Sequence, residues 1–153
     1  MQEVPQIKAA YDWMIDAYEA EVPTARAAGN LDRLEEKRDI LERGVFVMLF
    51  GQFESAVNDL FEIACDTRSA NPDWPRRRGW DIPAYLDLKN RRRRVPFETK
   101  LALLLDRHDP ARAKIMHAYG VRSHSAHGGS TEAIASIDQF VQDLYMWHGL
   151  LSR

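Results

Sequence analysis

The chain has 153 residues, of which 45% are hydrophobic and 29% are charged, values typical of a single soluble globular domain that buries its own core. No run approaches the roughly 18 apolar residues that span a bilayer, and residues 1–13 lack the basic start and apolar run of an export signal. Cys65 is the only cysteine, which excludes an intramolecular disulfide. We therefore expect a cytoplasmic protein that does not interact with membranes.

The net charge of −2 conceals an uneven distribution along the chain. Residues 1–66 carry 6 Lys or Arg against 14 Asp or Glu, a net charge of −8, whereas residues 67–153 carry 15 against 9, a net charge of +6. An acidic segment repels a polyanion and a basic one attracts it. If the chain binds nucleic acid, the second part is expected to do so.

Residues 4–28 place apolar side chains at helical spacing, which predicts an amphipathic helix. Pro23 should kink or end this helix because proline has no amide hydrogen and crowds the preceding turn. Asn30 is then a suitable N-cap for the next helix.

Residues 31–69 contain no proline and repeat apolar residues at three- and four-residue steps, which predicts one long helix or two collinear helices. A continuous helix would be about 58 Å long, against a radius of gyration of about 15 Å for a compact domain of this size. We therefore expect a break near Gly44 or Gly51, or a projection toward a partner. Gly51 also suggests the close approach of another helix.

Residues 70–95 interrupt the helical pattern with three prolines, and we expect a long loop with one short helix at 84–89. Loops of this length are often functional. Arginine suits phosphate and tryptophan can stack on a base, so the loop is a candidate for RNA binding. The alternative is a solvated loop whose tryptophans pack against the core and hold it in place. The candidate RNA-binding residues are Arg76, Arg77, Arg78, Arg91, Arg92, Arg93, Arg94, Trp74 and Trp80.

Three further helices are predicted, over residues 96–106, from Pro110 onward and over 131–151. Asp109 followed by Pro110 is a strong helix start, an N-cap before a proline in the first turn. Together these elements predict an all-α fold in one domain over residues 1–153. We expect an up-and-down bundle of four to five helices with one long arginine-rich loop.

Residues 119–130 combine one arginine, two histidines and several glycines and serines between two predicted helices. Arg122 is followed after four residues by His127 and then Gly128. This pattern closely resembles the Arg-x4-His signature of the HEPN superfamily, all-helical domains found in many prokaryotic toxin and defence ribonucleases. Ser123 stands where members of that superfamily often have Asn, and Gly129 stands where its nucleotidyl-transfer-regulated subset has Tyr.

The resemblance extends to residues 50–54, which look like the second-helix sequence of some HEPN families. It implies that Glu54 orients His127 or pairs with Arg122. The alternative is a solvated glutamate or a structural ion pair.

On a regular helix Arg122 and His127 would lie about 140° apart, so the pair converges only if the last turn unwinds or if each subunit of a dimer contributes to a shared cleft. The HEPN resemblance implies the second arrangement, a homodimer that cuts RNA without a metal or other cofactor. Histidine suits this reaction because its pKa lies near neutrality, and arginine suits the phosphate. Ser123 and His124 are supporting candidates, and Tyr119 and Ser125 are further candidates for substrate contact.

Several other interpretations stay open at this point. Arg122 and the two histidines could simply lie at the C-terminal end of a helix, where positive charges interact favourably with the negative end of the helix dipole. His117, His124 and His127 could bind a metal, although no carboxylate pattern accompanies them. Finally, a HEPN-like domain without catalysis could serve as a dimerisation or partner-binding module, with an antitoxin or regulatory protein as its partner.

Overall fold

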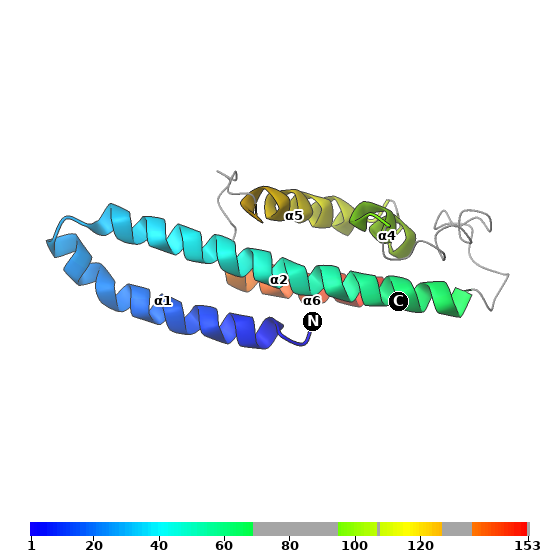
Figure 1. Cartoon of the computed structure of the whole chain (residues 1–153), viewed down its shortest axis with the longest axis horizontal. Coiled ribbons are helices and arrows are strands. Elements are labelled where there is room, and N and C mark those ends of the chain that lie inside the picture. The colour runs from blue at the N-terminus through cyan, green and yellow to red at the C-terminus, as the bar shows by residue number, and fades with distance from the viewer. Residues whose placement is uncertain (69–94, 107, 127–135, 153) are drawn as a thin grey trace. The chain divides into compact units, whose positions relative to one another are not determined.

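The computed structural model describes residues 1–68, 95–106, 108–126 and 136–152. These residues form five α-helices and no strands (Figure 1), which confirms the predicted all-α helical bundle. None of these helices is long and apolar enough to cross a membrane. The arginine-rich loop and the predicted helix at 84–89 lie outside the described residues. The helices are α1 (Val4–Ala27), α2 (Leu31–Arg68), α4 (Phe97–Leu104), α5 (Pro110–Ala126) and α6 (Ile137–Leu151).

The helices pack into two compact units. We call the first the hairpin unit, made from Met1–Gln52 and Gly120–Asp143, and the second the α4 unit, made from Phe53–Tyr119 and Leu144–Arg153. Helices α2, α5 and α6 each pass from one unit into the other.

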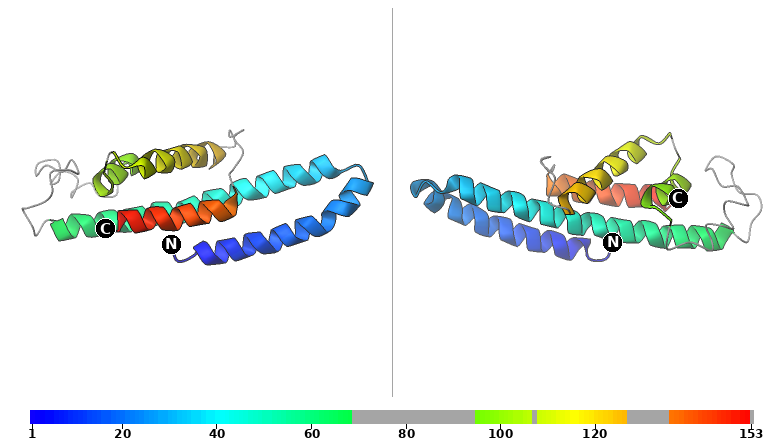
Figure 2. Two further views of the ribbon diagram at one scale, coloured as in Figure 1. Left: turned by 180° about the vertical axis from the view of Figure 1, so that it is seen from behind. Right: turned by 45° about the horizontal axis from the view of Figure 1, so that its top comes forward.

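Helices α1 and α2 form an antiparallel hairpin joined by a tight turn (Figures 1 and 2). Gly29 adopts a φ of 69°, a left-handed conformation that glycine adopts without steric cost. Its amide donates to the carbonyl of Arg26 at 3.2 Å, and the amide of Asn30 donates to the carbonyl of Ala25 at 2.9 Å. These two bonds form a Schellman motif, which satisfies the last carbonyls of α1 and reverses the chain. Asn30 immediately precedes α2, as predicted.

Helix α1 continues through Pro23 to Ala27, so the proline does not end it. Helix α2 is one helix of 38 residues through Gly44 and Gly51, so the expected break near these glycines is wrong. A glycine costs a helix only about 1 kcal/mol, which the burial of large apolar side chains such as Phe50 outweighs. Gly51 does not admit a close neighbour either, because a Cβ atom there would meet nothing within 4 Å in the described structure.

In the hairpin unit, the start of α6 packs against α2 through aromatic rings. The ring of Phe140 lies 4.4 Å from that of Phe46 and 6.4 Å from that of Phe50, centroid to centroid. The ammonium of Lys8 on α1 pairs with Asp138 on α6 at 2.7 Å. Helix α6 spans Ile137–Leu151, and residues 131–135, where the helix was predicted to begin, lie outside the described residues. These contacts attach its first turn to both helices of the hairpin.

A polar cluster joins the middle of α1 to α2. The Tyr11 hydroxyl donates to the Glu42 carboxylate at 3.1 Å, and Arg38 donates to the same oxygen at 2.9 Å. The guanidinium of Arg38 also lies over the Tyr18 ring, 5.3 Å from its centroid. Burial, with help from the Glu42 charge, raises the pKa of Tyr11. The cluster therefore aligns the two helices in one register.

The α4 unit has an aromatic core of its own. The ring of Phe53 on α2 meets those of Phe97 on α4 and Trp147 on α6 edge-to-face, with centroids 6.5 and 5.7 Å apart. Such edge-to-face pairs are the geometry that aromatic quadrupoles favour. Nearby, the largely buried Lys100 donates to Asn58 Oδ1 at 2.7 Å. These contacts fasten α4 to the second part of α2.

Candidate functional site at the end of helix α5

Helix α5 carries the described part of the Arg-x4-His motif, and its start follows the prediction. Asp109 Oδ1 accepts the amide hydrogen of Ala111 at 2.9 Å, which is the side-chain bond of an N-cap. Pro110 then occupies the first helical position. The helix continues through Gly120 as far as Ala126. It therefore holds four consecutive motif residues, 122–125, in one regular geometry.

Tyr119 anchors α5 immediately before the motif. Its ring stacks on that of Phe97, with centroids 4.7 Å apart and planes at 18°. Such a pair adds about 0.5–1.5 kcal/mol beyond the area it buries. The ring of Tyr119 therefore packs within the α4 unit, and its predicted contact with substrate stays a prediction.

Arg122 and Ser125 place polar atoms in a buried environment. The Nε atom of Arg122 and the Oγ atom of Ser125 are both shielded from solvent. They are three positions apart in the chain, so they lie about 60° apart on one side of the helix. Among the described residues, Ser125 Oγ has no hydrogen-bond partner. A buried hydroxyl without a partner costs free energy and marks a position where another polar group would be favourable.

Ser123 and His124 differ from this buried pair. His124 is exposed, and its Nδ1 atom lies 2.7 Å from the Gly120 carbonyl oxygen one turn earlier. A carbonyl only accepts, so Nδ1 carries the proton of this bond. His124 thus lies in the last turn of α5 and bonds back to the carbonyl of Gly120 in the preceding turn. Ser123 is half-buried beside it.

Glu54 lies half-buried on α2, in the α4 unit, whereas Arg122 belongs to the hairpin unit. Their predicted contact stays a prediction. His127, Gly128 and Gly129 lie outside the described residues. The same holds for all candidate RNA-binding residues of the loop, namely Arg76, Arg77, Arg78, Arg91, Arg92, Arg93, Arg94, Trp74 and Trp80.

Side chains that could hold a metal are not clustered in the part of the chain that the structure describes. No three His, Cys, Asp or Glu side chains there are placed to hold one ion. Of the three histidines considered as ligands, His117 and His124 lie on α5.

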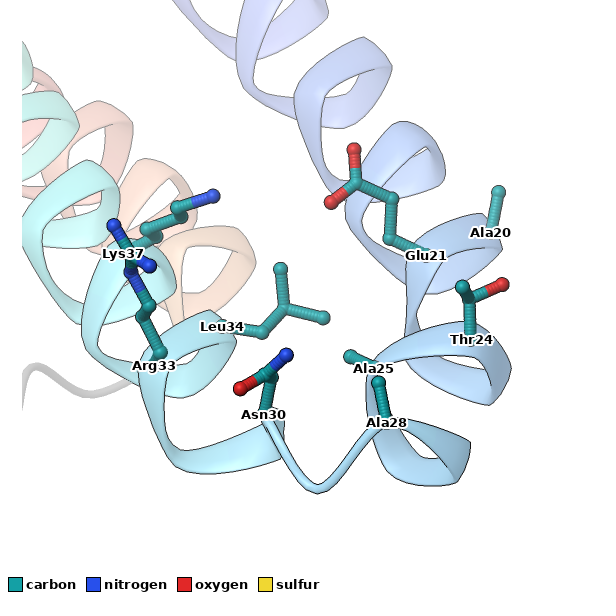
Figure 3. Close-up of a pocket in the computed structure, with 9 residues that line it drawn as sticks. All are labelled: Ala20, Glu21, Thr24, Ala25, Ala28, Asn30, Arg33, Leu34 and Lys37. Carbon is teal, nitrogen blue, oxygen red and sulfur yellow. The ribbon is translucent and has the colours of Figure 1, made fainter.

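A second site, which sequence reasoning missed, lies at the tip of the α1–α2 hairpin (Figure 3). It is an open pocket with a volume of about 490 Å³. Two cations, Arg33 and Lys37, line it on α2, and Glu21 lines it on α1. The signal in the sequence was the pair of like charges four residues apart at the start of a helix, Arg33 and Lys37.

Comparison of the chain with protein-family models, with curated proteins and with solved structures finds no match. The assignment of a function therefore depends on the residues of this chain alone.

Proposed function

We propose that this chain is a metal-independent endoribonuclease of the HEPN type, related to toxin or defence enzymes. The observation that carries the proposal is the local environment of Arg122. Its Nε atom is buried near the end of α5, as is the Ser125 hydroxyl on the same side of the helix, and His127 follows five residues later in the sequence. The all-α architecture is the one that the resemblance implies.

In the proposed reaction the 2′-hydroxyl oxygen of a ribose attacks the adjacent phosphorus atom. The new bond closes a 2′,3′-cyclic phosphate, the bond from phosphorus to the 5′ oxygen breaks, and the next nucleotide leaves with a 5′-hydroxyl. One histidine takes the proton from the 2′-hydroxyl and another gives a proton to the leaving oxygen. Arg122 holds the phosphate and stabilises the charge that develops on its oxygens.

The two histidine roles require two copies of the motif, so the proposed enzyme is a symmetric homodimer in which each subunit contributes Arg122 and His127. Closed two-fold pairing is the commonest oligomeric arrangement. Light scattering at micromolar concentration is expected to give the mass of a dimer. A monomer under all conditions of activity would exclude the composite site.

Substrate RNA is proposed to bind along the basic second part of the chain. Replacement of Arg91, Arg92, Arg93 and Arg94 by glutamine is expected to weaken RNA binding for all sequences and to flatten its salt dependence, because fewer counterions are released. Glutamine at the exposed Lys114 provides a control for the loss of a positive charge outside the loop. An unchanged affinity and salt slope would assign the arginines to another role.

The activity itself is tested by cleavage of single-stranded RNA, with and without EDTA, by the wild type and three variants. Removal of a positioned general acid or base costs a factor of about 100 to 10,000, so His127→Ala is expected to be nearly inactive. Arg122→Ala is expected to lose activity to a similar extent. His124→Ala should lose much less, because the described contact of its ring is with its own helix.

Two results would contradict the proposal. Intact RNA in every wild-type reaction would exclude catalysis. Loss of cleavage in EDTA, together with equal damage from His124→Ala and His127→Ala, would favour a metal-dependent reaction instead. Far-ultraviolet circular dichroism of each variant checks that the helices are retained.

A non-catalytic dimerisation or partner-binding module is the second candidate, and exposed apolar side chains favour it. Trp13 on α1 is 73% exposed, and Tyr145 and Met146 are neighbours on α6 that are 47% and 48% exposed. Large apolar side chains in water are enriched at interaction surfaces. This function predicts that RNA stays intact while Trp13→Ala or the pair Tyr145→Ala and Met146→Ala disrupts association.

A further inference from the structure

The pocket at the hairpin tip has one wall from each helix and an apolar floor. Figure 3 shows Arg33 and Lys37 on α2, with Glu21 across from them on α1. Ala25 and Leu34 lie between these walls. Every lining residue belongs to the hairpin unit, and none comes from α5. The pocket is therefore separate from the motif residues on α5.

Small side chains explain why this end of the hairpin is hollow. Further along the hairpin, Tyr11 and Tyr18 of α1 reach α2 and fill the space between the helices. At the tip, the residues of α1 that face α2 include alanines such as Ala25, which are too short to do so. Leu34 of α2 is nevertheless only 6% exposed. The site thus combines an apolar floor with space above it.

The two cations in the pocket have no partner within the described structure. Arg38 and Arg43, farther along the same helix, pair with Glu42 and Asp39 at 2.9 and 2.8 Å. In contrast, Arg33 and Lys37 make no ion pair or side-chain hydrogen bond with any described residue. They are one turn apart, so their charges repel each other.

We propose that this pocket binds a small phosphorylated molecule. A phosphate carries close to two negative charges and three acceptor oxygens, which matches the guanidinium fork of Arg33 together with the ammonium of Lys37. The body of the ligand lies on Ala25 and Leu34. Glu21 on the opposite wall accepts a hydrogen bond from an N–H or O–H group of the ligand.

The size and composition of the pocket fit such a ligand. Pockets for small molecules span roughly 300–1,000 Å³ and combine an apolar lining with a few charged groups that fix orientation. The volume of about 490 Å³ lies within this range. The fork of Arg33 can bind two oxygens of one phosphate while the ammonium of Lys37 binds the third, an arrangement that a carboxylate with its two oxygens cannot complete.

The proposal is tested by titration of the isotope-labelled chain with adenosine 5′-monophosphate, ribose 5-phosphate and adenosine, followed by amide chemical shifts. We expect saturable shifts for residues 20–37 with the two phosphorylated probes and none with adenosine. The double variant Arg33→Gln, Lys37→Gln should weaken binding at least about tenfold. The matched control, Arg26→Gln with Lys114→Gln, removes two positive charges outside the pocket and should bind as the wild type does.

A second variant fills the pocket without changing its charge. Ala25→Leu adds volume at the floor with a residue that favours helices, and it should block binding while helicity is retained. The proposal is overturned if neither phosphorylated probe gives saturable shifts up to about 10 mM, a limit that corresponds to very weak affinity. It is also overturned if adenosine binds as well as its monophosphate, or if the double glutamine variant keeps the wild-type affinity.

Discussion

Replacement of Ser125 by alanine is expected to make the protein more stable while it weakens the proposed activity. The Ser125 hydroxyl is buried on the same side of α5 as Arg122, and it has no hydrogen-bond partner in the described structure. Alanine removes this oxygen and changes little else in shape. The substitution therefore isolates the energetic cost of a buried polar atom next to the motif.

The size of the effect follows from two contributions. An unsatisfied buried polar group costs about 1–3 kcal/mol, and alanine is a better helix former than serine by about 0.5 kcal/mol. The free energy of unfolding of Ser125→Ala should therefore rise by roughly 1.5–3.5 kcal/mol. For a chain of this length, each kcal/mol corresponds to about 2–4 °C in Tm.

Ser123→Ala is the matched control for this measurement. Ser123 is also half-buried on α5, two residues earlier, but its hydroxyl is not among the shielded polar atoms without a partner. The free energy of unfolding of Ser123→Ala should rise only by the difference in helix propensity, about 0.5 kcal/mol. Urea denaturation of both variants, followed by circular dichroism, gives the difference between them.

An equal or lower stability of Ser125→Ala relative to Ser123→Ala would refute the reasoning, because it would mean that the hydroxyl is already satisfied. RNA cleavage by the same two variants supplies the functional comparison. If Ser125 contributes to the substrate site, Ser125→Ala loses activity as it gains stability. Increased stability with unchanged cleavage would assign the buried hydroxyl a purely structural role.

The remaining predictions concern the hairpin unit. Phe140→Ala removes a buried ring that packs on two others and should cost about 3–5 kcal/mol of unfolding free energy, measured by urea denaturation. Gly29→Ala forces a residue with a side chain into a left-handed conformation and should lower the free energy of unfolding by about 1–2 kcal/mol. Gly44→Ala, at a helical position with open space around it, should raise this free energy by about 0.5–1 kcal/mol. Equal changes in Tm for the two variants would contradict this contrast. Hydrogen bonds to carboxylates, first that of Asp12, raise the pKa of Lys8, and burial raises that of Tyr11. Each group therefore contributes its full stabilisation at pH values below the pKa that it has in the unfolded chain, near 10. This contribution is lost as the pH rises through the higher pKa that the group has in the folded chain. Lys8→Gln and Tyr11→Phe should each reduce the fall of Tm between about pH 9 and about pH 11, and an unchanged fall would contradict this linkage.

The sequence alone determined the helical elements and several of their ends. Helix starts depend on side chains within one turn of the cap, so Asp109 before Pro110 was sufficient to predict the start of α5. The apolar periodicity similarly predicted α4 and the all-α class. The Arg-x4-His motif is also a purely local pattern, which is why it could be recognised without a structure.

The continuity of α2 was decided by tertiary packing. Gly44 and Gly51 weaken a helix locally, and the length of the segment argued for a break. Instead, Leu49, Phe50 and Phe53 are completely buried along the helix. Burial of such side chains contributes more than a glycine costs. No local pattern contains this information, because the residues that cover these rings, such as Phe140, are far away in the sequence.

Only the tertiary structure decided which polar groups are buried and which charges have partners. Arg122, Ser123, His124 and Ser125 read alike as polar residues in the sequence, yet Arg122 and Ser125 hold shielded atoms while His124 turns back to its own helix. At the hairpin tip, the Schellman turn at Gly29 brings Glu21 of α1 opposite Lys37 of α2 and leaves a pocket between them. The physical reason is that solvent exclusion and charge pairing depend on segments brought together by packing, whereas helix propensity and capping depend on neighbours in the chain.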